Sequence, residues 1–146
     1  MQLTFLAALA LAAASLDSYL PSPAPAHQGT DLAARLTGTW HGRRTTPISI
    51  RADSFTMSWK RAPDGHMAGT VATAGEAKYP VNVVWSSDTA FIYESGPHMS
   101  ALLHERVITR ATVHFDGNQL NGTFEARPTK YEGKTTTGTF TALRSA

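Results

Sequence analysis

Short segments of alternating apolar and polar residues, separated by turns, constrain the fold of this chain most. Phe55, Met57 and Trp59 alternate with polar residues, and so do the apolar residues of 107–115. The second segment ends at Asp116-Gly117, a dipeptide that favours a tight hairpin. Alternation with a period of two is typical of a strand with one buried face. Such strands about every 8–12 residues, with turns between them, indicate an all-β sandwich or barrel.

Glycines inside the predicted strands favour a barrel over a sandwich. The pattern Gly-Thr-apolar occurs four times, beginning at Gly38, Gly69, Gly122 and Gly138. Glycine weakens a flat strand but permits the sharp coiling that a small barrel needs. We therefore predict an all-β fold, a single up-and-down antiparallel barrel of about eight strands, over residues 36–146.

The alternation also predicts which side chains fill the barrel. A barrel of about eight strands either packs its interior with side chains or holds one small ligand. Residues 99–107 do not fit the strand pattern, because their apolar residues have helical spacing, and they form either a lid helix or a loop. The predicted inward-facing residues are Trp40, Phe55, Met57, Trp59, Val71, Val81, Val83, Trp85, Phe91, Tyr93, Val113, Leu120 and Phe124.

The N-terminal sequence is typical of an export signal. The apolar run over residues 3–16 is shorter than the roughly 20 residues that span a bilayer. It is followed by Ala24-Pro25-Ala26, a small-x-small cleavage site. The chain has no Cys, which excludes disulfides and a lipidated cysteine anchor. We predict a signal peptide over residues 1–26, an N-terminal lead-in over 27–35, a secreted or periplasmic location, and no stable membrane anchor after cleavage.

The charge pattern argues against a nucleic-acid partner. The formal net charge is +2, and the basic doublets are Arg43-Arg44 and Lys60-Arg61. Both doublets lie near predicted strand ends, so we interpret them as solvated charges at the barrel rim. A nucleic-acid footprint would instead be a dense basic stripe.

No sequence motif indicates a catalytic or metal site. The chain lacks a nucleophile elbow, a phosphate loop and a dinucleotide fingerprint. A contact between His104 and Glu105 is unfavourable, because adjacent residues in an extended segment point to opposite faces. We predict no catalytic residue, no metal and no cofactor. The histidines lack the spacing of zinc ligands and are interpreted as surface or rim residues: His27, His41, His66, His98, His104 and His114.

Four segments resemble bacterial lipocalin-like (calycin) β-barrel domains. They are residues 36–42 (LTGTWHG), 64–71 (DGHMAGTV), 115–124 (FDGNQLNGTF) and 138–144 (GTFTALR). The resemblance covers residues 36–144. It implies an eight-stranded antiparallel barrel with an internal cavity.

The same resemblance implies structural roles for Gly38, Trp40 and Arg144. A Gly-x-Trp on the first strand and a basic residue at the end of the last strand close one end of a lipocalin-type barrel. Trp40 would then plug the barrel floor, and Arg144 would lie over its ring as a cation–π partner. These residues indicate a fold and identify no ligand.

An exported barrel with a cavity predicts a binding protein for a small apolar or amphipathic molecule. The ligand would contact Trp59, Trp85, Phe91 and Tyr93, and polar atoms of Tyr93 and Asn82 would orient it. Two alternatives remain open. One is a secreted or periplasmic inhibitor or protein-interaction module with a filled barrel, and the other is a cyclase or isomerase-type barrel enzyme. A dry cavity of roughly 300 Å³ or more favours binding or catalysis, whereas a filled barrel with an exposed apolar patch favours the interaction module.

Overall fold

The computed structural model describes residues 30–49, 51–130 and 133–146. The predicted signal peptide, residues 1–26, and residues 27–29 of the lead-in lie outside the described residues. Among the described residues, no helix combines the length and the apolar character that crossing a membrane requires.

One short helix and nine strands make up the described part of the chain. The helix α1 (Thr30–Leu36) precedes the first strand. The strands are β1 (Gly38–Thr45), β2 (Asp53–Arg61), β3 (Met67–Thr73), β4 (Tyr79–Ser86), β5 (Ala90–Ser95), β6 (His98–Ser100), β7 (Glu105–Asp116), β8 (Gln119–Pro128) and β9 (Thr136–Arg144).

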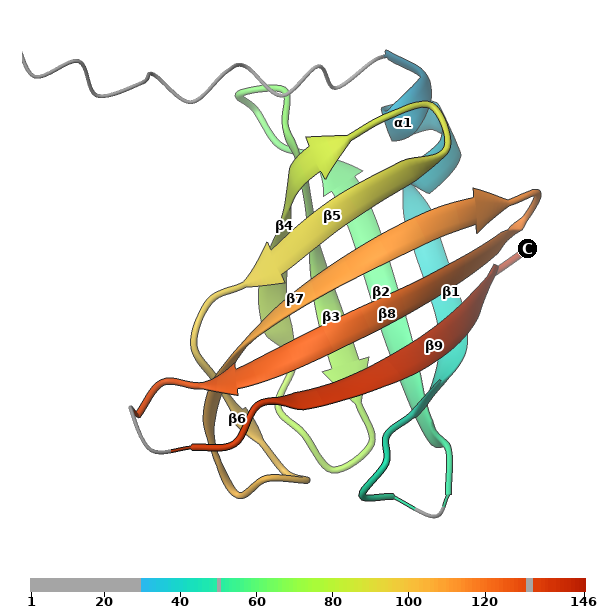
Figure 1. Cartoon of the computed structure of the whole chain (residues 1–146). Helices are drawn as coiled ribbons and strands as arrows, with labels where there is room; N and C mark the ends of the chain where they lie inside the picture. The colour runs from blue at the N-terminus through green and yellow to red at the C-terminus, as the bar shows by residue number, and fades with distance from the viewer. Residues whose placement is uncertain (1–29, 50, 131–132) are drawn as a thin grey trace, which may run out of the picture.

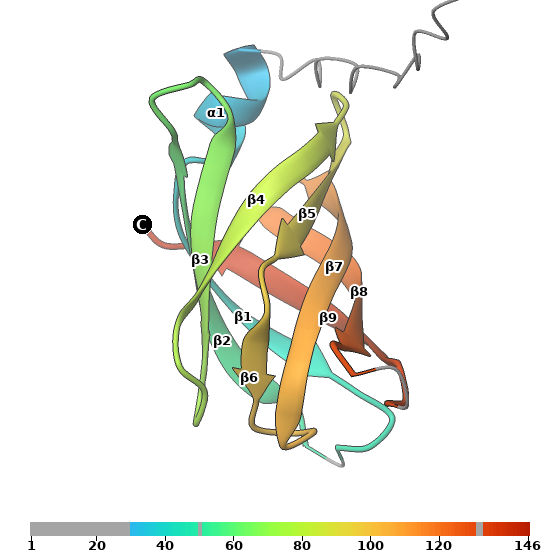
Figure 2. The same ribbon diagram turned by 90° about the vertical axis from the view of Figure 1, so that its left-hand side faces the viewer.

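The sheet closes on itself as an up-and-down antiparallel barrel (Figures 1 and 2). The strand order is β5-β4-β3-β2-β1-β9-β8-β7-β6, and an additional pairing of β5 with β7 closes the ring. The short strand β6 pairs with the start of β7, beyond the part that β5 occupies, and is an extra to the eight barrel strands. The predicted all-β barrel of about eight strands is confirmed.

Most of the predicted inward-facing residues are buried. Phe124 is only partly buried but packs against the core cluster. Those at most 6% exposed are Trp40, Phe55, Met57, Trp59, Val71, Val81, Val83, Phe91, Tyr93, Val113 and Leu120.

The prediction that Trp85 faces inward is wrong. Its side chain is 47% exposed. The register of β4 against β5 shifts between Val83 and Trp85, so that Val84 is an extra residue on β4. A bulge of this kind exchanges the two faces of the strand beyond it. Ser86 is consequently the buried residue at the end of β4.

The end of the barrel near α1 is closed by the helix and by Trp40. Leu36 of α1 is fully buried, and its carbonyl accepts a hydrogen bond of 2.9 Å from Trp40 Nε1. The guanidinium carbon of Arg144 lies 4.8 Å from the centroid of the Trp40 ring. Gly38 precedes Trp40 with a φ of +124°, which a residue with a side chain rarely adopts. We call this end, with α1, Trp40 and Arg144, the floor.

Candidate functional site

A small cavity lies inside the barrel at the end opposite α1, which we call the mouth. Its volume is about 40 Å³. Strand ends and turns position its walls, since residues near the ends of β1, β3 and β8 and the beginnings of β2, β4, β7 and β9 contribute to it. The apolar wall includes Phe55, Met57, Val71, Leu102, Leu103, Val107, Phe124 and Phe140, and the polar wall Arg44, Thr46, Thr73, Glu76, Tyr79, Tyr93, His98, Ser100, Thr109 and Thr136.

Glycines in the barrel wall make room for aromatic rings of the cavity, and Gly122 and Gly138 are two of them. A Cβ atom on Gly122 would overlap the ring of Phe140, and one on Gly138 would overlap the ring of Phe124. The rings of Phe140 and Phe55 also meet edge to face, with centroids 5.5 Å apart. Any other residue at these two glycine positions would displace a ring from the apolar wall.

Arg44 enters the cavity because it shares a strand face with Trp40. The two residues stand four positions apart on β1, and alternate residues of a strand point to the same side. The Arg44 side chain is 15% exposed, whereas Arg43 is exposed. The interpretation of both arginines as solvated rim charges is therefore wrong for Arg44.

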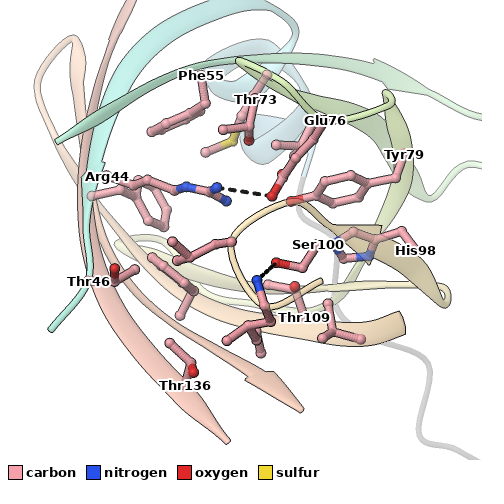
Figure 3. A pocket seen from close by; sticks show the side chains of 18 of the residues that line it. Arg44, Thr46, Phe55, Thr73, Glu76, Tyr79, His98, Ser100, Thr109 and Thr136 are labelled. Atoms are coloured by element: carbon pink, nitrogen blue, oxygen red, sulfur yellow. Dashed lines mark hydrogen bonds and ion pairs between the residues drawn. The ribbon is translucent and has the colours of Figure 1, made fainter. Parts of the chain in front are cut away.

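A buried carboxylate faces Arg44 from the other wall (Figure 3). Glu76, between β3 and β4, has a side chain only 1% exposed, and its Oε1 accepts a hydrogen bond of 3.2 Å from Arg44 Nη2. The same Oε1 accepts one of 3.1 Å from the backbone amide of Ala101. Asp53, at 37% exposure, lies 3.7 Å from Arg44 Nε. Charges interact strongly where water is excluded, so removing either partner of this pair would leave an uncompensated charge in the barrel.

Four polar atoms around this pair are buried without a hydrogen-bond partner. They are Arg44 Nε, Glu76 Oε2, Thr46 Oγ1 and Thr73 Oγ1. Buried polar groups are almost always satisfied in folded proteins, so unmet ones beside a cavity indicate a place for water or for a ligand. Trp59 Nε1 is also buried without a partner, but Trp59 does not line the cavity.

Tyr79 and His98 form a stacked pair at the side of the cavity. Their ring centroids lie 3.6 Å apart, with 12° between the ring planes. Nδ1 of His98 is 3.2 Å from both the Ser95 hydroxyl and the Gly96 carbonyl. Burial lowers the pKa of His98, and it raises the pKa of Tyr79 well above the usual range of a phenol. Both rings are therefore uncharged at neutral pH.

The segment with helical spacing forms a turn between β6 and β7, and not a helix. The amide of His104 donates to the Ser100 carbonyl at 2.8 Å, and that of Leu103 donates to the Ser100 hydroxyl at 3.2 Å. His104 has a φ of +55°, in the left-handed region. Leu102 and Leu103 are half-buried and line the cavity. We call residues 100–105 the mouth turn.

The structure separates the predicted ligand-contacting residues into two groups. Tyr93 lines the cavity, and Trp59 packs beneath it with ring centroids 5.5 Å apart. Phe91 is fully buried against Trp59, at 5.7 Å between centroids. Trp85 and Asn82 are exposed and do not line the cavity, and Asn82 Oδ1 lies 3.2 Å from His66 Nε2.

Sequence reasoning missed the two charged residues of the cavity. The face that Arg44 shares with Trp40 was a usable signal. Glu76 offered none, because it follows Gly75 in a turn where a charged residue normally meets solvent. In the described ranges, no three His, Asp or Glu side chains are grouped so that they could hold a metal ion.

No protein-family model matches the chain, and no curated protein or solved structure matches it. The closed antiparallel barrel is compatible with the lipocalin-like fold that the sequence resembles.

Proposed function

We propose that this protein is an exported, secreted or periplasmic, binding protein for a small amphipathic molecule, which it holds at the mouth of the barrel. One observation carries the proposal: an internal cavity with an apolar wall that also contains buried polar atoms without partners. Ligand sites are typically apolar pockets with a few polar groups that fix orientation. The export part rests on residues 1–26, with their apolar run and small-x-small site.

The size of the cavity requires a movement before a ligand binds. A volume of about 40 Å³ has room for about three water molecules, whereas pockets for larger ligands measure roughly 300–1,000 Å³. Leu102 and Leu103 occupy part of the mouth and belong to a turn, which can move without breaking the barrel. We therefore propose that the mouth turn swings outward and the apolar part of the ligand replaces the two leucines.

Binding of N-phenyl-1-naphthylamine, an apolar fluorescent probe, tests this function. We expect its fluorescence to rise and tryptophan emission to fall when it enters the barrel. Leu102→Ala/Leu103→Ala should strengthen binding several-fold, because it enlarges the space under the turn. Leu143→Ala is the matched control, since Leu143 is 58% exposed near the floor. If neither the wild type nor the double variant binds the probe, small-molecule binding is contradicted.

A protein-interaction module is the second candidate, and the small cavity favours it. A cavity of about 40 Å³ is close to the filled barrel that this class predicts. Met99 of β6, at the mouth, is 53% exposed and offers an apolar side chain to a partner there. Native mass spectrometry of the protein isolated from its own host separates the candidates. A bound small molecule supports the first, and a bound protein supports the second.

A further inference from the structure

Glu76 links the barrel wall to the mouth turn. Its Oε1 accepts hydrogen bonds from Arg44 of β1 and from the Ala101 amide of the mouth turn. The turn is held together internally by two bonds to Ser100. It can therefore move as a unit when the bond between Ala101 and Glu76 breaks. Movement of the turn would then take Leu102 and Leu103 away from the cavity.

The second oxygen of the same carboxylate receives no hydrogen bond from the protein. Glu76 Oε2 is buried and has no hydrogen-bond partner, and neither has Thr73 Oγ1 on the same side of the cavity. A carboxylate oxygen only accepts hydrogen bonds, so a ligand that satisfies it must bring an N–H or O–H donor. A hydroxyl such as that of Thr73 can then donate to the ligand, or accept from it.

The charge balance of the mouth selects an uncharged donor. Arg44 and Glu76 neutralise each other, and the partly exposed Asp53 adds a negative charge 3.7 Å from Arg44 Nε. A carboxylate ligand would add a third negative charge beside Glu76 and Asp53. An ammonium ligand would lose its hydration shell and compete with Arg44 for Glu76. A hydroxyl or a primary amide satisfies Oε2 without changing the net charge.

We propose that Glu76 is both the head-group site and the latch of the mouth: a ligand hydroxyl or amide N–H donates to Oε2 of the Glu76 carboxylate, the Ala101 amide leaves Oε1, and the mouth turn opens. Oε1 keeps the hydrogen bond from Arg44, and the bond lost from Ala101 is replaced by the ligand's bond at Oε2, so the number of hydrogen bonds to the carboxylate is conserved. This inference rests on the proposed function and deepens it. It assigns the ligand class as amphipathic molecules with an uncharged hydrogen-bonding head.

Three ligands with the same eight-carbon tail test the head group: 1-octanol, octanoate and octylammonium, each displacing N-phenyl-1-naphthylamine at neutral pH. We expect 1-octanol to bind about tenfold more tightly than either charged ligand, the factor that one satisfied bond to a charged group supplies. Glu76→Gln should reduce 1-octanol affinity about tenfold. Asp53→Asn, which removes the same charge beside Arg44 at a more exposed site, should change it less than about twofold.

Hydrogen exchange of the wild-type protein tests the latch without a mutation. The Ala101 amide should be protected in the free protein and should exchange faster when 1-octanol saturates the mouth. Equal or tighter binding of octanoate or octylammonium, unchanged 1-octanol affinity in Glu76→Gln, or unchanged Ala101 exchange would each overturn the inference. In those cases the probe still binds, so the proposed function stands. Absence of any probe binding removes both.

Discussion

The two ends of this barrel treat their polar groups in opposite ways. At the floor, Trp40 is 1% exposed, its Nε1 has a carbonyl partner, and the Arg144 cation lies on its ring in contact with solvent. At the mouth, the Glu76 carboxylate is buried and Arg44 is largely so, and each retains a polar atom without a hydrogen-bond partner. Trp40 and Arg144 satisfy the ordinary rules of a stable core, and the unmet polar atom toward this end is the uncharged Trp59 Nε1, on the residue paired with Gly38. The mouth departs from them, and such departures concentrate at functional sites.

The contrast exists within one strand. Trp40 and Arg44 lie on the same face of β1, four residues apart. One face of a single strand therefore carries the apolar plug of the floor and the largely buried cation of the mouth. The same scaffold therefore supplies stability at one end and an incompletely satisfied site at the other. If the two ends differ in this way, they should also differ in whether a second substitution can restore the stability that a first one removes.

Truncation of the floor should have the largest effect on stability. We expect Trp40→Ala to lower the free energy of unfolding by about 3–5 kcal/mol, because it empties a large, fully buried volume and removes the cover of the barrel end. Equilibrium denaturation in urea measures the loss. A nearly neutral result would mean that Trp40 does not close the barrel, and the comparison of the two ends would fail.

Breaking the charged pair at the mouth should cost almost as much, but this loss should be reversible. Glu76→Leu leaves the Arg44 cation with only the partly exposed Asp53, and we expect a loss of about 3 kcal/mol. Adding Arg44→Leu should restore most of the stability, since it removes the unpaired charge. Denaturation of the single and double variants measures the recovery. If the double variant is as unstable as the single one, the Arg44–Glu76 pair itself stabilises the fold, contrary to this comparison.

Arg144 should contribute less than Trp40. Its stacking on the ring and the packing of its stem predict a loss of about 1–2 kcal/mol for Arg144→Ala. Lys60→Ala on β2 is the control, because Lys60 is also an exposed cation on a strand. Equal effects in both variants would indicate a general loss of charge and not a contact with Trp40.

Trp85 sharpens the comparison between the interior and the outer wall. Because the bulge in β4 turns its side chain outward, Trp85→Ala should change stability by about 0.5 kcal/mol and leave N-phenyl-1-naphthylamine affinity unchanged. Trp59→Ala, at a residue 2% exposed, is the internal reference and should cost about 3–5 kcal/mol. A marked loss of probe affinity in Trp85→Ala would place the ligand on the outer wall.

The smallest effect concerns pH at the side of the mouth. Burial lowers the pKa of His98 in the folded protein, so the unfolded chain binds the proton more readily. Stability contributed by this residue is therefore present above the ordinary pKa of about 6.5 and is lost as pH falls below it. Tyr79 stacks on the ring, and Glu76 and Arg44 are the nearby charges. Compared with the wild type, His98→Gln should show a shallower fall in urea midpoint between about pH 6.5 and pH 5.

Much of the fold was predictable because it follows from local patterns. Alternating residues defined the strands around Phe55 and Val113, and Asp116-Gly117 marked the hairpin between β7 and β8. The site was less predictable. A bulge such as the one before Trp85 depends on pairing with a neighbouring strand and leaves no reliable local signal. The spacing of Leu102 and Leu103 fitted a helix, but a turn that packs onto a cavity requires the same apolar residues.

The sequence by itself determined the all-β class, the closed barrel and most of its interior, because the period of two and the turn residues act over short stretches of chain. Only the tertiary structure decided what the mouth contains. Arg44, Glu76 and Ala101 are far apart in sequence, and closure of the barrel and the turn after β6 bring them within hydrogen-bonding distance. Whether a charged residue meets water or another charge depends on that closure, and no local pattern encodes it.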